Sequence, residues 1–228
     1  MKFKTYLSVN SKRMAILALT SVLALESISS SASAMQNQYP AVEQEAINME
    51  NTWLVCNCDT NSWYDNNKDD TEFIISKPEQ LAGLALLVNG GINFKDKIIK
   101  LNKNLNMSEH IWTPIGTYGA QFVGTFDGNN KTISNLTTKQ TMPNQGLFGY
   151  NSGIIRNIGI IDSDIKGTFN VGGIAGKIDG NAKIENSYNK GNVEGLRCVG
   201  GIAGMIDDNA KIENSYNKGN VTGKGFVG

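Results

Sequence analysis

The chain has 228 residues, of which 40% are hydrophobic and 21 each are basic and acidic. Three cysteines (Cys56, Cys58 and Cys198) are too few, and odd in number, for a fold built on disulfides. With a single histidine, His110, they also argue against a metal site. The sequence predicts one domain of ordinary size, with no metal and no cofactor.

The first 34 residues form a predicted secretory signal peptide. Four basic residues precede an apolar run, Met14 to Leu25, that is too short to span a membrane. Ala32 and Ala34 match the pattern that signal peptidase recognises, so we expect cleavage after Ala34 and a secreted or cell-surface protein. The mature chain keeps 17 basic and 20 acidic residues and no second apolar run of that length. The slight excess of acidic residues argues against nucleic acid as a partner. The absence of a second apolar run argues against a transmembrane segment in the mature chain.

An irregular N-terminal segment is expected from residue 35 to residue 75. Within it, Asp65, Asn67 and Asp69 are spaced like the ligands of a calcium loop, but the glycine and the closing glutamate of such a loop are missing. A disordered or solvated loop is the better interpretation. Trp53, Trp63 and Trp112 fit either exposed contact residues or core packing, and we expect Trp112 to be buried.

A capping helix is predicted over residues 77 to 89. Ser76 and Glu79 have the spacing of a capping box, an apolar run follows, and Asn89, Gly90 and Gly91 end it. A solenoid needs such a cap because its ends expose unpaired strand edges.

Internal repeats dominate the remainder. Residues 171 to 198 recur at 199 to 226 with identity at 22 of 28 positions. Weaker copies precede this pair, because an Ile-x-Asn element starts at four isoleucines and a glycine column runs beside it. The elements are Ile133, Ile155, Ile184 and Ile212, and the glycines are Gly124, Gly146, Gly173 and Gly201.

Each repeat is predicted to form one coil of short strands. Gly and Asn recur too often for helices, and the segment 183 to 188 alternates with the period of two that is typical of strands. Stacked coils would place Ile184 over Ile212 in the core and Asn186 over Asn214 in an amide ladder. Lys183 and Glu185 would face their own twins, with opposite charges meeting on the diagonal.

The twin repeats differ mainly around one turn. Four of their six differences lie at 194, 196, 197 and 198 against 222, 224, 225 and 226. Relaxed constraint on a turn explains this, and so does a ridge that contacts a ligand. The candidate binding residues of that ridge are Glu194, Leu196, Arg197, Thr222 and Lys224.

No catalytic centre is expected. His110 alone excludes a metalloprotease motif and is better read as structural or surface histidine. Ser187-x-x-Lys190 and Ser215-x-x-Lys218 match a penicillin-binding string only by chance. Paired carboxylates for polysaccharide cleavage could come from turn residues, although Asp is common at turns for backbone reasons. Those residues are Asp162, Asp164, Asp179, Asp207 and Asp208.

Several segments in order, among them EQLAGLALLVNGG at 79 to 91, GLFGY at 146 to 150 and VGGIAG at 171 and 199, resemble bacterial surface proteins with GLUG repeats. The resemblance covers residues 72 to 228. It implies a right-handed parallel β-helix, similar to that of pectate lyases, in exported proteins that include adhesins and parts of immunoglobulin A-cleaving metalloproteases. It supplies no catalytic residue.

We therefore expect an all-β, right-handed parallel β-helix (β-solenoid) with an N-terminal capping helix, over residues 76 to 228. Val227 and Gly228 match the start of a further repeat, so the last repeat reads as truncated. The expected function is a non-enzymatic exported scaffold for adhesion, binding or display, with an extracellular glycan or protein as partner. A carbohydrate-active β-helix and an accessory region of a secreted protease are the alternatives. The open edge of the last coil could also pair with another chain.

Overall fold

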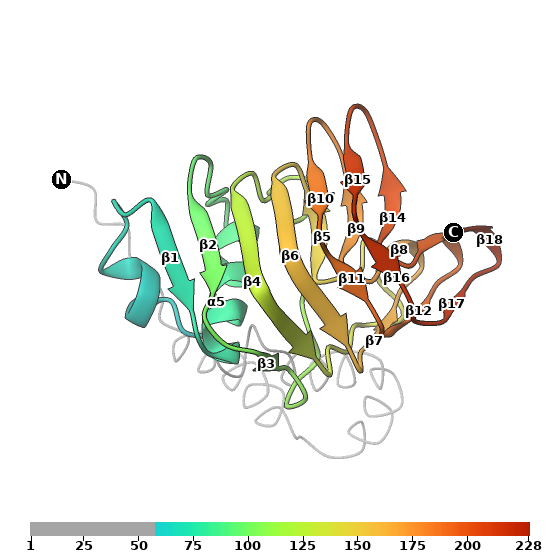
Figure 1. Ribbon diagram of the computed structural model, residues 1–228, viewed down its shortest axis with the longest axis horizontal. Helices are drawn as coiled ribbons and strands as arrows, with labels where there is room; N and C mark the ends of the chain where they lie inside the picture. Colours follow the sequence, from blue (N-terminus) through green and yellow to red (C-terminus); the bar gives the residue numbers. More distant parts are fainter. Residues whose placement is uncertain (1–57) are drawn as a thin grey trace, which may run out of the picture. The chain divides into compact units, whose positions relative to one another are not determined.

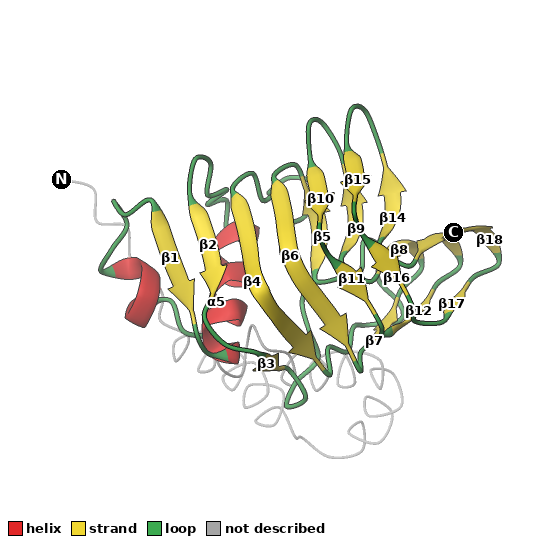
Figure 2. Ribbon diagram, viewed as in Figure 1, coloured by secondary structure: helices red, strands yellow, loops and turns green. Residues whose placement is uncertain are grey.

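Residues 58 to 228 are described by the structure, a computed structural model. Cys56, Trp53 and the expected signal peptide lie outside them. The described part is a parallel β-solenoid, in which all paired named strands run parallel (Figures 1 and 2). Its longest sheet crosses every coil in the order β1-β2-β4-β6-β10-β15, and three further sheets have the orders β5-β9-β14, β7-β12-β17 and β8-β13-β18.

The elements are short, as a coil with several corners requires. Two helical segments come near the start: η1 (Asn61–Asp65) and α5 (Pro78–Asn89). The strands are β1 (Glu72–Ile75), β2 (Ile98–Leu101), β3 (Leu105–Asn106), β4 (Thr125–Ser134), β5 (Phe148–Asn151), β6 (Ile154–Ile161), β7 (Asp164–Lys166), β8 (Phe169–Gly172), β9 (Ala175–Ile178), β10 (Lys183–Glu185), β11 (Tyr188–Asn189), β12 (Asn192–Glu194), β13 (Arg197–Gly200), β14 (Ala203–Ile206), β15 (Lys211–Glu213), β16 (Tyr216–Asn217), β17 (Val221–Thr222) and β18 (Gly225–Val227).

One column of side chains runs through all the coils and forms the core of the long sheet. Each member pairs in register with the next: Phe73, Ile99, Phe126, Ile155, Ile184 and Ile212. All except Ile212 are at most 2% exposed. A fully buried side chain of this size contributes about 2 kcal/mol to stability. The predicted stacking of Ile184 on Ile212 is confirmed.

The predicted frame of the earliest repeat was wrong. Ile133 pairs with Ile160, and it is Phe126 that stacks on Ile155. The register shifts between Asp127 and Lys131, where β4 has extra residues relative to β6, so a fixed Ile-x-Asn spacing slips from one column to another. The predicted glycine column was also wrong at its start, because Gly124 precedes the pair of Thr125 with Ile154 and lies at the level of Gly153, not of Gly146.

Helix α5 completes the first coil where later coils use strands. It follows β1 directly, and its end is tied to the next coil because Asn89 donates to the Pro114 carbonyl and accepts from the Gly116 N–H at 3.1 and 2.8 Å. Ile115, in that segment, pairs with Phe148 of β5. The helix therefore covers the start of the β5-β9-β14 sheet.

The start of α5 differs from the prediction by one residue. Lys77 is the N-cap, and the residue that reaches back is Gln80, whose Oε1 accepts from the N–H groups of Ser76 and Lys77 at 2.8 and 3.1 Å. Pro78 fixes the first helical position, which shifts the cap away from Ser76. The first strand begins at Glu72, ahead of the expected start of the β-helix at residue 76.

The segment before β1 is only in part the expected disordered or solvated loop: residues 66 to 71 are exposed, whereas the residues before them are packed against the first coil. Trp63 and Tyr64 are buried and contact Phe73 and Phe94 with ring centroids 5.3 to 6.2 Å apart. The Asp59 carbonyl sits so close to helix α5 that a Cβ at Gly83 would lie 2.0 Å from it. Trp112 is 2% exposed, as predicted, and its Nε1 donates to the Leu147 carbonyl at 3.1 Å.

Two corners of the coil use left-handed backbone. Asn157, Asn186 and Asn214 occupy one corner with φ of 55, 49 and 48°. The second corner, which we call the left-handed column, has Asn144, Asn170, Cys198 and Phe226 with φ of 52, 54, 54 and 52°. Asn tolerates this conformation better than other residues with a Cβ. The left-handed conformation is therefore retained at Cys198 and Phe226, although their side chains do not favour it.

The predicted amide ladder exists at a neighbouring position. Asn189, which is fully buried, donates from Nδ2 to Oδ1 of Asn217 at 2.8 Å and also closes a turn with both backbone groups of Gly191. Asn186 and Asn214, for which the ladder was predicted, occupy the left-handed corner three residues earlier. A period of two in the strand did not reveal this corner, which changes the direction of every side chain after it.

Candidate binding ridge and groove

The variable residues of the twin repeats stack into one ridge along the solenoid axis. Glu194 pairs with Thr222 and Arg197 with Gly225, and the Lys224 N–H donates to the Leu196 carbonyl at 3.2 Å. Strands β12, β13, β17 and β18 hold these positions in register, so the ridge is fixed by the same backbone ladder that fixes the core. Sequence reasoning therefore placed all five candidate residues on one exposed corner.

A polar groove borders the ridge. It has a volume of about 750 Å³ and shares Glu194 and Thr222 with the ridge. Its remaining lining comes from three successive coils: Asp162, Ser163, Asp164, Lys166, Lys190, Gly191, Asn192, Val193 and Asn220. Leu196, Arg197 and Lys224 do not line the groove but follow it around the corner.

Lys166 forms ion pairs with two carboxylates that line the groove. Its ammonium lies 3.0 Å from a carboxylate oxygen of Asp164 and 3.7 Å from one of Glu194 in the next coil. The hydrogen bond with Asp164, followed by the weaker contribution of Glu194, raises the pKa of Lys166. The pair of carboxylates is thus bridged by an ammonium, an arrangement suited to hydrogen bonding with a polar ligand.

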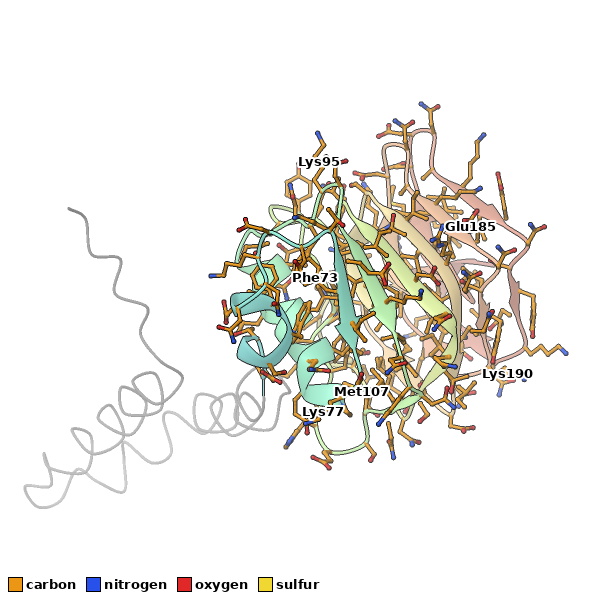
Figure 3. The ribbon with its side chains drawn as sticks, turned by 60° about the vertical axis from the view of Figure 1, so that its left-hand side comes forward. Phe73, Lys77, Lys95, Met107, Glu185 and Lys190 are labelled. Atoms are coloured by element: carbon orange, nitrogen blue, oxygen red, sulfur yellow. The ribbon has the colours of Figure 1, made fainter. Side chains whose placement is uncertain are left out.

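Stacked tyrosines stand beside the groove, and sequence reasoning missed them. The rings of Tyr188 and Tyr216 are nearly parallel, 9° apart, with centroids 5.4 Å apart. Lys190 and Lys218 lie 5.1 and 5.3 Å from the centroids of these rings, and Lys190 projects from the surface (Figure 3). The signal was available in the sequence, because both residues of each pair recur in the duplication.

A glycine makes room for this stack. Tyr188 pairs in register with Gly159, and a Cβ at Gly159 would lie 2.3 Å from the Tyr188 ring. Tyr188 therefore leans over the preceding coil and not straight out of the sheet.

The acids considered for polysaccharide cleavage belong to two different corners. Asp162 and Asp164 line the groove between β6 and β7, whereas Asp179, Asp207 and Asp208 follow β9 and β14. Asp179 accepts hydrogen bonds from Tyr150 at 2.6 Å and Ser152 at 2.5 Å. The five acids therefore do not form one centre.

The corner after β9 and β14 contains a half-buried lysine. Lys177 lies 2.7 Å from Asp207 and over the ring of Tyr150, 5.2 Å from its centroid. The hydrogen bond with Asp207 raises the pKa of Lys177 far above its ordinary value, against the opposing effect of burial. Burial, assisted by Asp179, raises the pKa of Tyr150. Both groups therefore keep their protons at neutral pH.

The remaining sequence motifs have structural surroundings. The Ser187 hydroxyl donates to the Glu185 carbonyl at 2.7 Å and is 1% exposed, and Ser215 repeats this bond to Glu213. Asp65, of the calcium-like stretch, binds Lys68 at 3.2 Å and the Thr60 hydroxyl at 2.6 Å. His110 is half-buried in a turn after β3.

Two further properties concern residues 58 to 228. No cluster of three or more His, Cys, Asp or Glu side chains in this part of the chain is arranged to bind a metal ion. None of its helices combines the length and apolar character that a bilayer crossing would need.

The family comparison agrees with the coil boundaries. The family model described as the GLUG motif matches residues 167–194 and 195–222, which contain every ridge residue except Lys224. This chain carries two GLUG repeats. The GLUG motif identifies a structural repeat and not a reaction, so it assigns no catalytic residue to the chain.

A solved structure shares the fold. The crystal structure of a "putative immunoglobulin A1 protease" from Bacteroides ovatus superposes with a TM-score of 0.54 at 21% sequence identity. The match covers 72% of this chain and 52% of that chain, so this chain spans about half the length of the Bacteroides ovatus protein. Comparison with curated proteins gave no significant match.

Proposed function

We propose that this GLUG-repeat chain is a non-enzymatic, exported region of a larger secreted or cell-surface protein, and that its ridge and groove bind an extended extracellular partner. Export is inferred from the predicted signal peptide at residues 1 to 34, which lies outside the described residues. A stack of coils supports the binding role because it repeats the same surface position along a straight axis.

The main support for this proposal is that the twin coils share the same core side chains but differ on their exposed surface. Ile184 and Ile212 are in register in the core, and the segment 183 to 193 is identical to 211 to 221. Four of the six differences fall instead on the exposed ridge. Change at a contact surface over a constant scaffold is typical of binding proteins.

A carbohydrate-active enzyme is the second candidate, because Asp164 and Glu194 are paired acids that line a groove. A glycosidase holds the scissile bond between two carboxylates. Here the ammonium of Lys166 bridges them. This contact favours a binding role over hydrolysis. A role as the accessory region of a secreted protease is a third candidate, suggested by the description of the Bacteroides ovatus protein.

The test uses the full chain and a ridge-swap variant. This variant gives the first repeat the ridge of the second through Glu194→Thr, Leu196→Lys, Arg197→Gly and Cys198→Phe. All four residues already occupy the equivalent positions of the next coil, so we expect circular dichroism and thermal unfolding to change little. Both proteins are immobilised and exposed to a panel of polysaccharides and extracellular matrix proteins.

We expect at least one ligand to bind the wild-type chain and to bind the ridge-swap variant roughly tenfold more weakly, a difference of about 1.4 kcal/mol. Equal binding of every ligand by the two proteins would overturn the ridge as the binding surface. Release of reducing ends or unsaturated sugars from any polysaccharide by the wild-type chain would favour the second candidate.

A further inference from the structure

Three of the exposed apolar side chains of the solenoid lie on the ridge corner. Met142, Phe169 and Leu196 are 51, 47 and 42% exposed and come from three successive coils. Their backbones are directly linked, because the Thr168 N–H donates to the Met142 carbonyl at 3.0 Å and the Leu196 N–H donates to the Thr168 carbonyl at 2.9 Å. We call these three residues the apolar row. Contiguous apolar surface of this kind marks a site of contact with another molecule.

Three cations lie close in the sequence to the apolar row. Within the described part of the chain, Lys139, Arg197 and Lys224 take part in no ion pair, and all three lie within three residues of the row or of its continuation in the last coil. The nearest acidic residue of the ridge, Glu194, already forms an ion pair with Lys166. The ridge corner therefore presents apolar side chains in a positive field, whereas the groove beside it is balanced.

Backbone strain singles out the same corner. Cys198 and Phe226 follow the ridge positions and have φ of 54 and 52°, a conformation that their side chains do not favour. The equivalent residues in the two preceding coils are Asn144 and Asn170, which tolerate it. Residues held in unfavourable backbone conformations concentrate at functional sites. In both twin coils the ridge corner therefore holds a backbone conformation that its side chain does not favour.

We propose that the apolar row, with Lys139, Arg197 and Lys224, is the docking surface for an acidic protein segment that carries apolar side chains. The inference rests on the proposed binding function and names the partner class. The partner's carboxylates meet the three cations, and its apolar side chains cover Met142, Phe169 and Leu196. An anionic membrane has related chemistry, but three side chains that are only about half exposed offer little apolar surface for insertion into an acyl layer.

The probe is a short fluorescein-labelled peptide of alternating glutamate and leucine, with a lysine-leucine peptide as its charge control. Binding to the full chain is followed by fluorescence anisotropy at two salt concentrations. We expect the acidic peptide to bind, to bind more weakly at high salt, and to lose roughly tenfold in affinity with Leu196→Ser or Arg197→Glu.

Matched controls come from another face. The control variants are Ile154→Ser and Lys211→Glu. Ile154 is 36% exposed on β6, and Lys211 lies on β15. We expect neither change to weaken binding of the acidic peptide. Equal effects of the ridge and control variants, or preference for the lysine-leucine peptide, would overturn the proposal. So would binding to phosphatidylglycerol vesicles that depends on Leu196 while the acidic peptide does not bind. If a polysaccharide binds in a ridge-dependent way and the peptide does not, the proposed function stands and this inference fails.

Discussion

The ammonium of Lys183 lies 2.9 Å from the carboxylate of Glu213 in the next coil, as well as 2.6 Å from Glu185 in its own strand. The duplication places Glu185 directly opposite Glu213, and the diagonal contact of Lys183 offsets this like-charge pair. The predicted diagonal arrangement is confirmed.

Replacing Lys183 with Met should therefore lower the melting temperature more than Lys211→Met does. Lys183 contacts two carboxylates, and its hydrogen bonds lower the pKa of Glu213. A lowered carboxyl pKa gives stability that is present above the unfolded-state value and is lost as pH falls through the folded-state value. Differential scanning calorimetry between pH 6 and pH 3 should thus show the difference between wild type and Lys183→Met shrinking below about pH 4.5. A constant difference across this range would contradict the contact.

The variant Asp127→Asn should remove part of the acid sensitivity of the long sheet. The carboxylate of Asp127 is 13% exposed. Burial alone would raise its pKa, but hydrogen bonds from Asn157, the Asn129 N–H and Arg156 outweigh burial and lower it. The stabilisation is present above the unfolded-state pKa and is lost as pH falls below about 4.

We expect Asp127→Asn to cost about 1–2 kcal/mol at pH 7 and much less at pH 3, measured by urea unfolding. Glu72→Gln is the control, because Glu72 is 48% exposed and 4.0 Å from Lys100. This change should cost less than about 0.5 kcal/mol at either pH. If Asp127→Asn loses as much at pH 3 as at pH 7, the acid sensitivity does not come from this carboxylate.

Cys198→Asn should stabilise the protein. Cys198 belongs to the left-handed column, where Asn144 and Asn170 are joined by an amide hydrogen bond of 2.8 Å. An asparagine at 198 would suit the backbone and could extend that bond to a third coil, for a gain of about 0.5–1 kcal/mol. The reverse change, Asn170→Cys, should lose a similar amount. Chemical denaturation of the two variants tests both, and a destabilised Cys198→Asn would show that the backbone at 198 is not strained.

Removing the buried amide of Asn189 should be more costly than removing an exposed one. Asn189→Ala removes a fully buried amide and leaves both backbone groups of Gly191 without their side-chain partner, at a cost of about 2 kcal/mol. Asn220→Ala removes an exposed amide contact of 3.3 Å and should stay within about 0.5 kcal/mol. Equal losses in thermal unfolding would contradict the role of burial.

The sequence was sufficient for the parts of the fold that follow from duplication. Identity between twin repeats predicts that Ile184 meets Ile212 and that Lys183 meets Lys211, because equal spacing in a stack implies equal height. It did not suffice for the first coils. The extra residues in β4 change the spacing of Ile133 without changing its side-chain chemistry, so only the hydrogen-bond register reveals its partner.

The candidate site was predicted in part for the same reason. The ridge positions came from comparing two copies, and their stacking needed only the repeat length. The groove and the tyrosine stack depend on the corners of the coil, where Asn186 takes a left-handed conformation and turns Tyr188 over Gly159. The only sequence signal of such a corner is an asparagine. Because asparagines are frequent throughout the repeats, this signal does not locate the corner.

The in-register columns also limit how such a chain can change in length. A segment of 28 residues can be gained or lost between Lys183 and Lys211 while every column stays continuous, because one whole coil is added or removed. A segment one residue shorter would turn core side chains outward on half of the coil and move asparagines out of the left-handed corners. Recombination between nearly identical repeats produces whole-coil changes automatically. The length of the proposed binding surface can thus change in steps of one coil, with the local chemistry of each coil left intact.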